Sequence, residues 1–310
     1  MDEIDLSQHF LGKELRYPLL VNALTGGTDQ ARRINQALAY ISRKHGLAMA
    51  LGSQTIALED QGLRETFSIV REINPGGLLM ANLAASASLE KVLSAVEMIS
   101  ADAVQLHFNV PQELAMYEGD RNFKGVLKNI ENIACHCPVP LIAKEVGFGF
   151  SREAVKMLFD SGVKIFDNGG KGGTNFIVIE DQRDGNFNHE LYDWGIPTAI
   201  SLAEIISLKL PIGVIASGGI RTATDAAKAI AMGAECVGMA APFLKILLDG
   251  GIEELDKMVS SFLYRLRAVF LMTASRNIKE MQKQPLIIVK ETAEWLRARE
   301  IDPHFCSKRI

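Results

Sequence analysis

Short β-rich apolar runs alternate along the chain with segments of helical periodicity. Eight such runs have the length and composition of buried strands. The intervening segments place apolar residues at i, i+3, i+4 and i+7, as in 88–100 (SLEKVLSAVEMIS) and 151–161 (SREAVKMLFDS), the latter opened by a Ser that can cap a helix. The pattern predicts eight strand–helix units. The predicted strands cover residues 18–23, 48–51, 78–83, 103–108, 141–146, 164–167, 213–216 and 236–239.

This alternation, with continuously apolar strands, indicates a parallel α/β sheet. Eight repeats without a long interruption favour closure into a (β/α)8 TIM barrel, and an open doubly wound sheet is the alternative. Helical patterns over 251–275 and in the tail containing ETAEWLRARE predict the last barrel helix and an appended C-terminal helix. Because no linker rich in Pro, Gly or Ser precedes them, we expect residues 1–310 to form one domain.

Composition and charge narrow the class of partner. The net charge of −4 provides no general attraction to nucleic acid or to an anionic membrane, so phosphate recognition must be local. No apolar run is long enough to cross a bilayer, and MDEIDLSQHF has no secretory signal pattern. No second cluster of ligands in the sequence could complete a zinc site with Cys135 and Cys137. We therefore expect these two cysteines to be buried or edge thiols that bind no metal. We therefore expect a cytoplasmic protein with a small-molecule partner.

Polar residues collect where the predicted strands end. In a parallel barrel these ends meet at one mouth, where active sites lie. The fourth strand runs into QLHFNVPQELAMYEGD, which presents His107, Asn109, Gln112 and Glu113 within seven residues. A histidine on an apolar strand is commonly a satisfied core residue, but His107 shares a strand-end face with Asn109, which favours a ligand contact. Further along, residues 120–121 (DR) either order the loop over the site or pair with each other.

The seventh and eighth strand ends have the features of a phosphate site. ASGGIRT (216–222) is a strand, a glycine turn that exposes backbone N–H groups, and the start of a helix, with Arg221 at the turn. With GMAAP (238–242) it matches the phosphate site common after strands seven and eight of such barrels. A similar stretch, GGKGGT (169–174), follows strand six. Glycines used only for tight turns are the alternative.

Lys144 stands inside the fifth predicted strand, LIAKEVG. A lysine there is costly unless it is paired or faces a polar cavity, so we expect it to point into the mouth. It could form a Schiff base, bind an anion or stabilise negative charge on a cofactor ring. The residues alone do not choose among these roles.

Over almost its whole length the chain resembles the type 2 isopentenyl-diphosphate isomerases, FMN-dependent enzymes that interconvert isopentenyl and dimethylallyl diphosphate. The pattern H-x-N-x-x-Q-E after strand four is the distinguishing feature, since other FMN barrels share the phosphate turns but not this motif. The resemblance is carried by NALTGGT, ALGSQ, ANL, QLHFNVPQE, EGDRNF, KEVGFG, GGKGGTNFIVIE, WGIPTA, ASGGIR and GMAAP.

The resemblance implies a role for each matching position. Gln112 and Glu180 would be catalytic, and Glu113 would be the Mg²⁺ ligand. His107, Asn109 and Gln112 would line the substrate pocket, with His107 in contact with the diphosphate. Lys144 would face the electron-rich pyrimidine edge of FMN, whose phosphate would lie at 219–221 and 240–241. The implied FMN contacts are Ala23, Leu24, Thr25, Ser53, Asn82, Lys144, Thr174, Gly219, Ile220, Arg221, Ala240 and Ala241.

The implied reaction is a 1,3-proton transposition: one proton is added to a terminal alkene carbon and another is removed from the far allylic carbon. No ordinary side chain is acidic enough to do this easily, and Gln112 is hardly acidic at all. The resemblance therefore implies that reduced FMN serves as the acid and base, with NADPH needed only to reduce it. Mg²⁺ on Glu113 would neutralise the diphosphate. The family also implies a homo-oligomer, a tetramer or larger.

The sequence departs from the family pattern in three places. The family normally has an earlier Arg-Lys segment that grips the diphosphate, and this sequence has none. An FMN-binding homologue with impaired or no turnover is therefore the alternative function. Leu24 replaces the usual Met, and Phe108 the usual Leu or Ile, for which we expect repacking.

Other FMN chemistries fit the sequence less well. A 2-hydroxy-acid oxidase would need a His base and paired arginines near strand seven, where Arg221 stands alone. A reaction like that of inosine-monophosphate dehydrogenase would need a Cys nucleophile after strand six, and NGGKGGT contains none.

Overall fold

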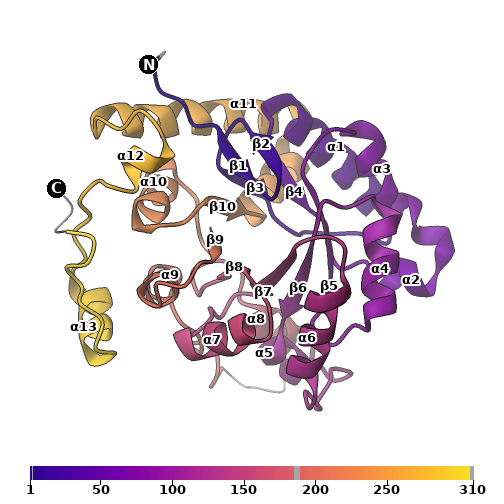
Figure 1. The fold of residues 1–310 in the computed structure, drawn as a ribbon. Helices are drawn as coiled ribbons and strands as arrows, with labels where there is room; N and C mark the ends of the chain where they lie inside the picture. Colours follow the sequence, from indigo (N-terminus) through magenta and orange to yellow (C-terminus); the bar gives the residue numbers. More distant parts are fainter. Residues whose placement is uncertain (2, 185–188, 308–310) are drawn as a thin grey trace.

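Eight parallel strands close into a barrel in the computed structural model, which describes residues 1, 3–184 and 189–307 (Figure 1). Neighbours in sequence are neighbours in the sheet, and the last strand pairs with the first. The predicted TIM barrel and all eight predicted strands are confirmed, with bounds that differ by at most two residues. The strands are β3 (Leu19–Val21), β4 (Ala48–Ala50), β5 (Leu79–Ala84), β6 (Ala103–Phe108), β7 (Leu141–Glu145), β8 (Ile165–Asp167), β9 (Gly213–Ser217) and β10 (Cys236–Met239).

Helices form the outer layer around the barrel. Two predicted helix starts are confirmed: the Ser88 and Ser151 hydroxyls accept hydrogen bonds from backbone N–H groups of the first turn. In α11, Gly251 has φ 75° and joins two helical parts, of which the second is the helix predicted over 251–275. None of the described helices is long and apolar enough to cross a membrane. The main outer helices are α1 (Asp29–His45), α3 (Glu65–Ile73), α4 (Leu89–Met98), α6 (Val126–His136), α7 (Arg152–Asp160), α9 (Thr198–Ser207), α10 (Ala223–Met232) and α11 (Ala241–Met272).

Shorter helices lie mainly in the loops that connect a barrel strand to the next outer helix along the chain. They include α5 and α8, which follow β6 and β8 and lie at the end of the barrel opposite the first strands of the chain (Figure 1). These segments carry most of the polar residues singled out from the sequence. The short helices between strands are α2 (Thr55–Glu59), the 3₁₀-helix η1 (Gln61–Leu63), α5 (Val110–Ala115) and α8 (Phe176–Asp184).

The barrel interior changes from apolar to polar along the strand direction. Side chains two residues apart on a strand share one face, so each step of two moves one level along the interior. At the lower level the inward side chains form an apolar cluster that includes Leu20, Met80, Ala103, Ile142 and Ile215. At the level above, the residues two positions later are Asn22, Asn82, Gln105, Lys144 and Ser217, all buried.

A short hairpin closes the amino-terminal end of the barrel. It consists of β1 (Gln8–Phe10) and β2 (Lys13–Leu15), which pair antiparallel. Phe10 and Leu15 are 3% and 2% exposed and pack against the lower interior cluster. The two-residue turn has φ 52° at Leu11 and 78° at Gly12, the positive values that two-residue hairpin turns favour. The sequence patterns did not predict this hairpin, and it leaves the opposite end as the open mouth.

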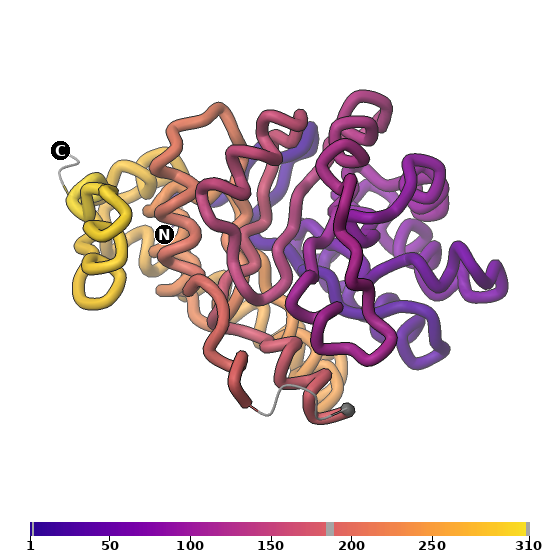
Figure 2. The backbone as a smooth tube through the Cα atoms, turned by 90° about the horizontal axis from the view of Figure 1, so that it is seen from below, coloured from indigo at the N-terminus to yellow at the C-terminus, as the bar shows by residue number. Residues whose placement is uncertain are grey.

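The appended C-terminal helix lies on the flank of the barrel. Figure 2 shows the segment that contains α12 (Ile278–Met281) and α13 (Lys290–Ala298) along one side of the molecule. The fully buried Glu204 carboxylate of α9 holds it in place. This carboxylate accepts hydrogen bonds from Trp295 Nε1 at 2.8 Å and from Arg299 Nε at 3.0 Å. The prediction of an additional helix is confirmed.

Replacing Trp295 with Phe tests this attachment. The variant retains most of the packing area but removes one hydrogen bond to a charged acceptor, so we expect the free energy of unfolding to fall by about 1 to 3 kcal/mol. Trp194 is the matched control, because it is 60% exposed against 38% for Trp295. Its replacement by Phe should change stability by no more than about 0.5 kcal/mol. Urea denaturation followed by circular dichroism measures both; equal losses would contradict the assigned role of Trp295.

Candidate functional site

The predicted site residues all lie at the carboxyl ends of the strands or in the segments directly after them. Segment 23–25 follows β3, Ser53 follows β4, and Asn82 lies within β5. Segments 219–221 and 240–241 follow β9 and β10, which are neighbours in the sheet. The barrel therefore brings the residues to one mouth. The remaining positions are His107 and Lys144 near the ends of β6 and β7, Asn109, Gln112 and Glu113 at and within α5, Thr174 after β8, and Glu180 within α8.

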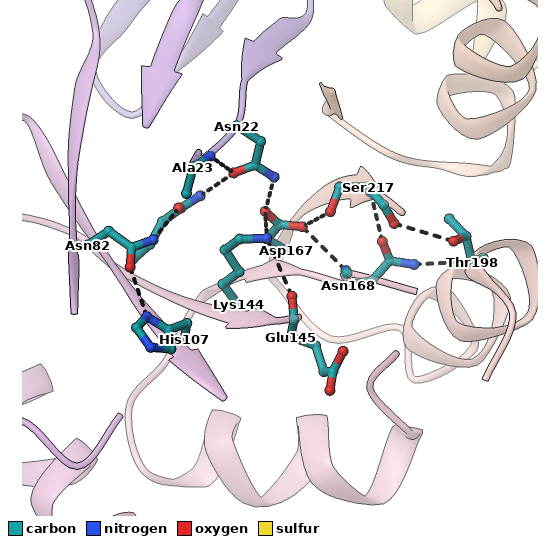
Figure 3. A network of polar contacts seen from close by, with 12 residues as sticks. Asn22, Ala23, Asn82, His107, Lys144, Glu145, Asp167, Asn168, Thr198 and Ser217 are labelled. Atoms are coloured by element: carbon teal, nitrogen blue, oxygen red, sulfur yellow. Dashed lines mark hydrogen bonds and ion pairs between the residues drawn. The ribbon is translucent and has the colours of Figure 1, made fainter. Parts of the chain in front are cut away.

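A buried layer of polar side chains forms the floor of this mouth (Figure 3). Asn22 Nδ2 donates to Asp167 Oδ2 at 2.7 Å, and Gln105 Nε2 donates to Asn22 Oδ1 at 3.3 Å. Asn82 Nδ2 donates to Gln105 Oε1 at 3.1 Å, and Asn82 Oδ1 lies 2.8 Å from His107 Nδ1. Five side chains from four strands or their ends are thus joined across the barrel.

Lys144 belongs to the same layer. Its Nζ lies 3.3 Å from Asp167 Oδ2 and also donates to the Glu145 carbonyl at 3.4 Å. Asp167 is completely buried, and its second oxygen accepts from the Ser217 hydroxyl. The ion pair offsets the cost of placing a lysine inside a barrel strand. Lys144 therefore supplies a fixed positive charge at the floor of the mouth.

Helix α5 delivers the polar motif that follows β6. Asn109 precedes the helix and Pro111 lies in its first turn, where the missing N–H of proline costs nothing. Gln112 Nε2 donates to Glu180 Oε1 of α8 at 2.9 Å, and Glu180 is buried. Arg183 Nη1 donates to the other Glu180 oxygen at 2.6 Å. The two residues implied to be catalytic, 68 positions apart in sequence, are therefore in direct contact.

Glu113 is held by the loop that follows α5. Its Oε1 accepts from Asn109 Nδ2 at 2.8 Å, and its Oε2 accepts from the Asp120 backbone N–H at 2.9 Å. The Arg121 guanidinium donates to the backbone carbonyls of Glu113, Met116 and Gly119. Of the two possibilities for residues 120–121, the structure shows that they order the loop.

The donor set at Glu113 suits a metal shared with a substrate. No cluster of three or more His, Cys, Asp or Glu side chains able to hold a metal occurs among residues 1, 3–184 and 189–307. Mg²⁺ commonly takes only one or two protein carboxylates and fills its other positions with water and phosphate oxygens. The half-buried Glu113 carboxylate, already fixed by two hydrogen bonds, fits that mode of binding.

The turns after β9 and β10 leave backbone donors free. Within the described part of the chain, the N–H groups of Gly219, Ile220, Ala240 and Ala241 donate to no protein acceptor. Gly219 has φ 80°. The following helix α10 begins with a capping box formed by Thr222 and Asp225, the third residue of the helix. Unpaired N–H groups at adjacent strand ends, next to helix amino termini, are a suitable arrangement for a phosphate group.

The glycines of the turn after β9 pack closely against those of the loop after β8. A Cβ at Gly218 would lie 2.1 Å from the Gly170 carbonyl oxygen, and one at Gly219 would lie 2.3 Å from that of Gly172. The β8 loop and the β9 turn therefore pack backbone against backbone, which only glycine permits. The sequence suggested that GGKGGT could be a second phosphate turn. Close backbone packing also explains the glycines in this stretch.

An apolar cavity lies beside the polar motif. It has a volume of 230 Å³, and its lining includes His107, Glu113 and several aromatic rings. Phe108 and Phe150 line it and meet edge to face, with ring centroids 5.6 Å apart. Phe150 thus gives the Phe108 ring a packing partner in this cavity.

Two titratable groups near the mouth are shifted by burial. The pKa of His107 is lowered to about 4, first by burial and then by the positive charge of Lys144, so the imidazole is neutral at pH 7. The pKa of Glu145 is raised to about 8 by burial, although the Phe148 and Gly149 N–H groups, which donate to its carboxyl group, act in the opposite direction. Glu145 faces the 147–149 turn, away from the polar layer (Figure 3).

Replacing Glu145 with Gln should remove a pH dependence of stability. The native carboxyl group retains its proton up to about pH 8, whereas an unfolded glutamate releases it near its ordinary value. The native state thus binds more protons between those values, and the free energy of unfolding falls as the pH rises through this interval. Glu145→Gln should lack this loss, and a Gln oxygen can still accept both N–H groups.

Chemical denaturation at several values between pH 5 and pH 9 measures the difference between the variant and the unmodified protein. The exposed Glu97 of α4, replaced by Gln, is the control. A Glu145→Gln difference that stays constant with pH, as the control difference should, would contradict a protonated Glu145.

The sequence patterns did not identify the polar layer as a unit. Asn22, Gln105, Asp167 and Ser217 were not predicted as site residues, although each hydrogen bonds within it. The signal that would have found all four is the step of two from an apolar to a polar residue on one strand face, as from Ala103 to Gln105.

Comparisons with known proteins identify the family. Residues 61–288 match the FMN-dependent dehydrogenase family. An isopentenyl-diphosphate delta-isomerase from Moorella thermoacetica is 46% identical over 298 residues, which are 96% of this chain and 86% of the relative. That of Symbiobacterium thermophilum is 43% identical over 97% of this chain and 84% of the relative.

Solved structures of similar fold include mandelate oxidases and a protein named as a lactate oxidase. A lactate oxidase from Pediococcus acidilactici has a TM-score of 0.68 at 16% identity, covering 93% of this chain and 80% of its own. A mandelate oxidase with benzoyl-formic acid has a TM-score of 0.64 at 17% identity, covering 90% and 81%. At this identity the likeness shows the fold alone, whereas the relatives with more than 40% identity specify the family. The chain therefore belongs to the type 2, FMN-dependent isopentenyl-diphosphate delta-isomerases.

Proposed function

We propose that the protein interconverts isopentenyl diphosphate and dimethylallyl diphosphate by 1,3-proton transposition, using reduced FMN, Mg²⁺ and NADPH as the flavin reductant. The contact between Gln112 and Glu180 carries the proposal, because it joins an amide and a buried carboxylate at the mouth that also contains the free N–H groups. Two further features support it. Glu113 lies next to Gln112, and the relatives are isomerases of this diphosphate by name.

FMN would lie across the mouth with its phosphate at the β9 and β10 turns. The N–H groups of 219–220 and 240–241 and the Arg221 side chain would bind the phosphate oxygens. Lys144, fixed by Asp167, would place its charge near the pyrimidine edge of the ring. When bound, the reduced flavin would supply acid and base of a strength that no side chain here offers. The remaining proposed contacts are Ala23, Leu24, Thr25, Ser53, Asn82 and Thr174.

The protein side chains would hold the alkene and its diphosphate in place. Glu180 is buried and held between Gln112 and Arg183, so its carboxylate occupies a fixed position from which it can exchange a proton with the substrate. Gln112 would orient it and contact the substrate. Glu113 would bind Mg²⁺, whose charge would neutralise the diphosphate, while His107 and Asn109 would line the substrate pocket. The subunits would assemble into a tetramer or larger homo-oligomer.

One anaerobic experiment tests the proposal. Purified protein is incubated with FMN, Mg²⁺, NADPH and labelled isopentenyl diphosphate, with a matched sample that lacks the reductant. Formation of dimethylallyl diphosphate only in the reduced sample is the expected result, and deuterium from D₂O should enter the product. Bound flavin without product would instead indicate an FMN-binding homologue without turnover, and failure to take up FMN would contradict both functions.

A further inference from the structure

The polar layer contains a continuous chain of hydrogen bonds that crosses the barrel (Figure 3). It starts at the Asp167 carboxylate and passes through the side-chain amides of Asn22, Gln105 and Asn82. It ends at His107 Nδ1, 2.8 Å from Asn82 Oδ1. Each amide has a donor end and an acceptor end, so a chain of this kind has a direction.

Fixed groups at one end of the chain set its direction. Asp167 accepts hydrogen bonds and pairs with the Lys144 ammonium, so Asn22 must turn its NH₂ group toward it. The backbone N–H of Ala23 donates to Asn22 Oδ1 at 2.9 Å, which fixes the oxygen end independently. Turning the Asn22 amide over would place oxygen against carboxylate and NH₂ against N–H. Its orientation is therefore determined twice.

The direction passes from one amide to the next. Asn22 Oδ1 receives the NH₂ group of Gln105, which leaves Gln105 Oε1 facing Asn82. Asn82 donates its NH₂ group to that oxygen and presents Oδ1 to the imidazole. An oxygen at this position requires a donor on His107, so the proton must be on Nδ1.

We propose that the chain Asp167–Asn22–Gln105–Asn82 holds the neutral imidazole of His107 in its Nδ1–H tautomer, which makes Nε2 a hydrogen-bond acceptor toward the mouth. Asp167, Asn22 and Gln105 are thus positioning residues that act on the site through Asn82. Nε2–H is the form that histidine side chains favour in water, so the chain reverses the ordinary preference.

The tautomer restricts what His107 can bind. The His107 side chain lines the same cavity as Asn109 and Glu113. Burial and the positive charge of Lys144 keep the pKa of His107 low. A neutral ring with an unprotonated Nε2 cannot donate to a phosphate oxygen, which itself only accepts. The expected partner in the mouth is therefore a donor such as a water or a hydroxyl group. This consequence for diphosphate binding rests on the proposed function, whereas the tautomer does not.

Nitrogen-15 NMR of the protein without substrate tests the tautomer directly. The six histidines are labelled, and the signals that disappear in His107→Gln are assigned to His107. Two-bond proton–nitrogen spectra at pH 7 distinguish a protonated from an unprotonated ring nitrogen. We expect Nδ1 to be protonated and Nε2 unprotonated, and a protonated Nε2 in the unmodified protein would overturn the proposal without any variant.

Replacing Gln105 with Met tests the role of the chain. Met has a similar length and no amide, so Asn82 is released to turn over and present its NH₂ group to Nδ1. We expect a substantial shift of His107 toward the Nε2–H form. Gln61→Met, at an exposed position, is the control and should leave the spectrum unchanged. An unaltered Nδ1–H signal in folded Gln105→Met would overturn the role of the chain. Because no substrate is present, absent isomerase activity would leave these results unaffected.

Discussion

Glu113→Gln should lower kcat/KM for isopentenyl diphosphate by roughly 100-fold or more while leaving FMN affinity unchanged. The substitution removes the only charge that the α5 motif offers to Mg²⁺ and retains the size of the side chain. Asn109 can still donate to the Gln oxygen, but the Gln NH₂ group would then face the Asp120 N–H, so the loop should also loosen. The loss should affect metal binding and diphosphate binding together.

Anaerobic isomerisation rates at increasing Mg²⁺ concentration measure this effect. The variant should need more Mg²⁺ for half-maximal rate, and excess metal should restore part of the activity. Glu131→Gln is the control, since Glu131 is an exposed acidic residue on the outer helix α6. An unchanged Mg²⁺ dependence in Glu113→Gln would contradict the metal role, even if the rate itself fell.

Gly219→Ala should lower FMN affinity by roughly 100-fold or more. A Cβ at this position would lie 2.3 Å from the Gly172 carbonyl oxygen, so the turn after β9 must move. Its free N–H groups would then lose their alignment, and each charge-assisted hydrogen bond to phosphate contributes about 1.5 to 3 kcal/mol. Two such losses account for the expected change in affinity.

Gly125→Ala is the matched control for backbone strain. Gly125 has φ 87°, close to the 80° of Gly219, and a Cβ there meets nothing within 4 Å. Both substitutions impose the cost of a positive φ, roughly 1 to 2 kcal/mol of stability. Quenching of FMN fluorescence measures the affinities, and thermal unfolding confirms that both variants fold. Equal affinities in the two variants would show that the β9 turn does not hold the phosphate.

The barrel strands could be predicted because their burial leaves a strong local signal. In β6 the apolar run of AVQLHF and the polar residues after it predicted both bounds. The hairpin of β1 and β2 has strands of only three residues, and Leu11 occupies a positive φ that its residue type does not suggest. Its stability comes from the barrel interior that it covers, which is a tertiary effect that local patterns do not contain.

The family resemblance named the candidate site residues as a set, and the barrel places them at one mouth, but their contacts could not be predicted from the sequence. Family resemblance named both Gln112 and Glu180, while their hydrogen bond depends on how α5 and α8 pack across the mouth. The chain from Asp167 to His107 depends on which side chains face one another across the interior. The position of a residue along its strand determines which face of the sheet its side chain occupies. The closure of the sheet into a barrel determines which side chains then come into contact across the interior.

Glycine patterns were the most ambiguous signal. Gly170 and Gly219 occur in similar sequence contexts, since GGKGGT and SGGIR each follow a strand. A tight turn, a phosphate cradle and close backbone packing all select glycine for the same reason, the absence of a Cβ. The structure separates these uses only because it shows which backbone atoms lie nearby.

Pairing of β3 with β10 has a consequence for synthesis of the protein. The first barrel strand has an open edge until residues 236–239 leave the ribosome, because that edge pairs with the last strand. At typical rates of translation the wait is roughly 10 to 40 seconds. During this time the edge of Leu19–Val21 can pair with another nascent chain. The interval before ring closure is therefore when the edge of this strand is most open to pairing between chains.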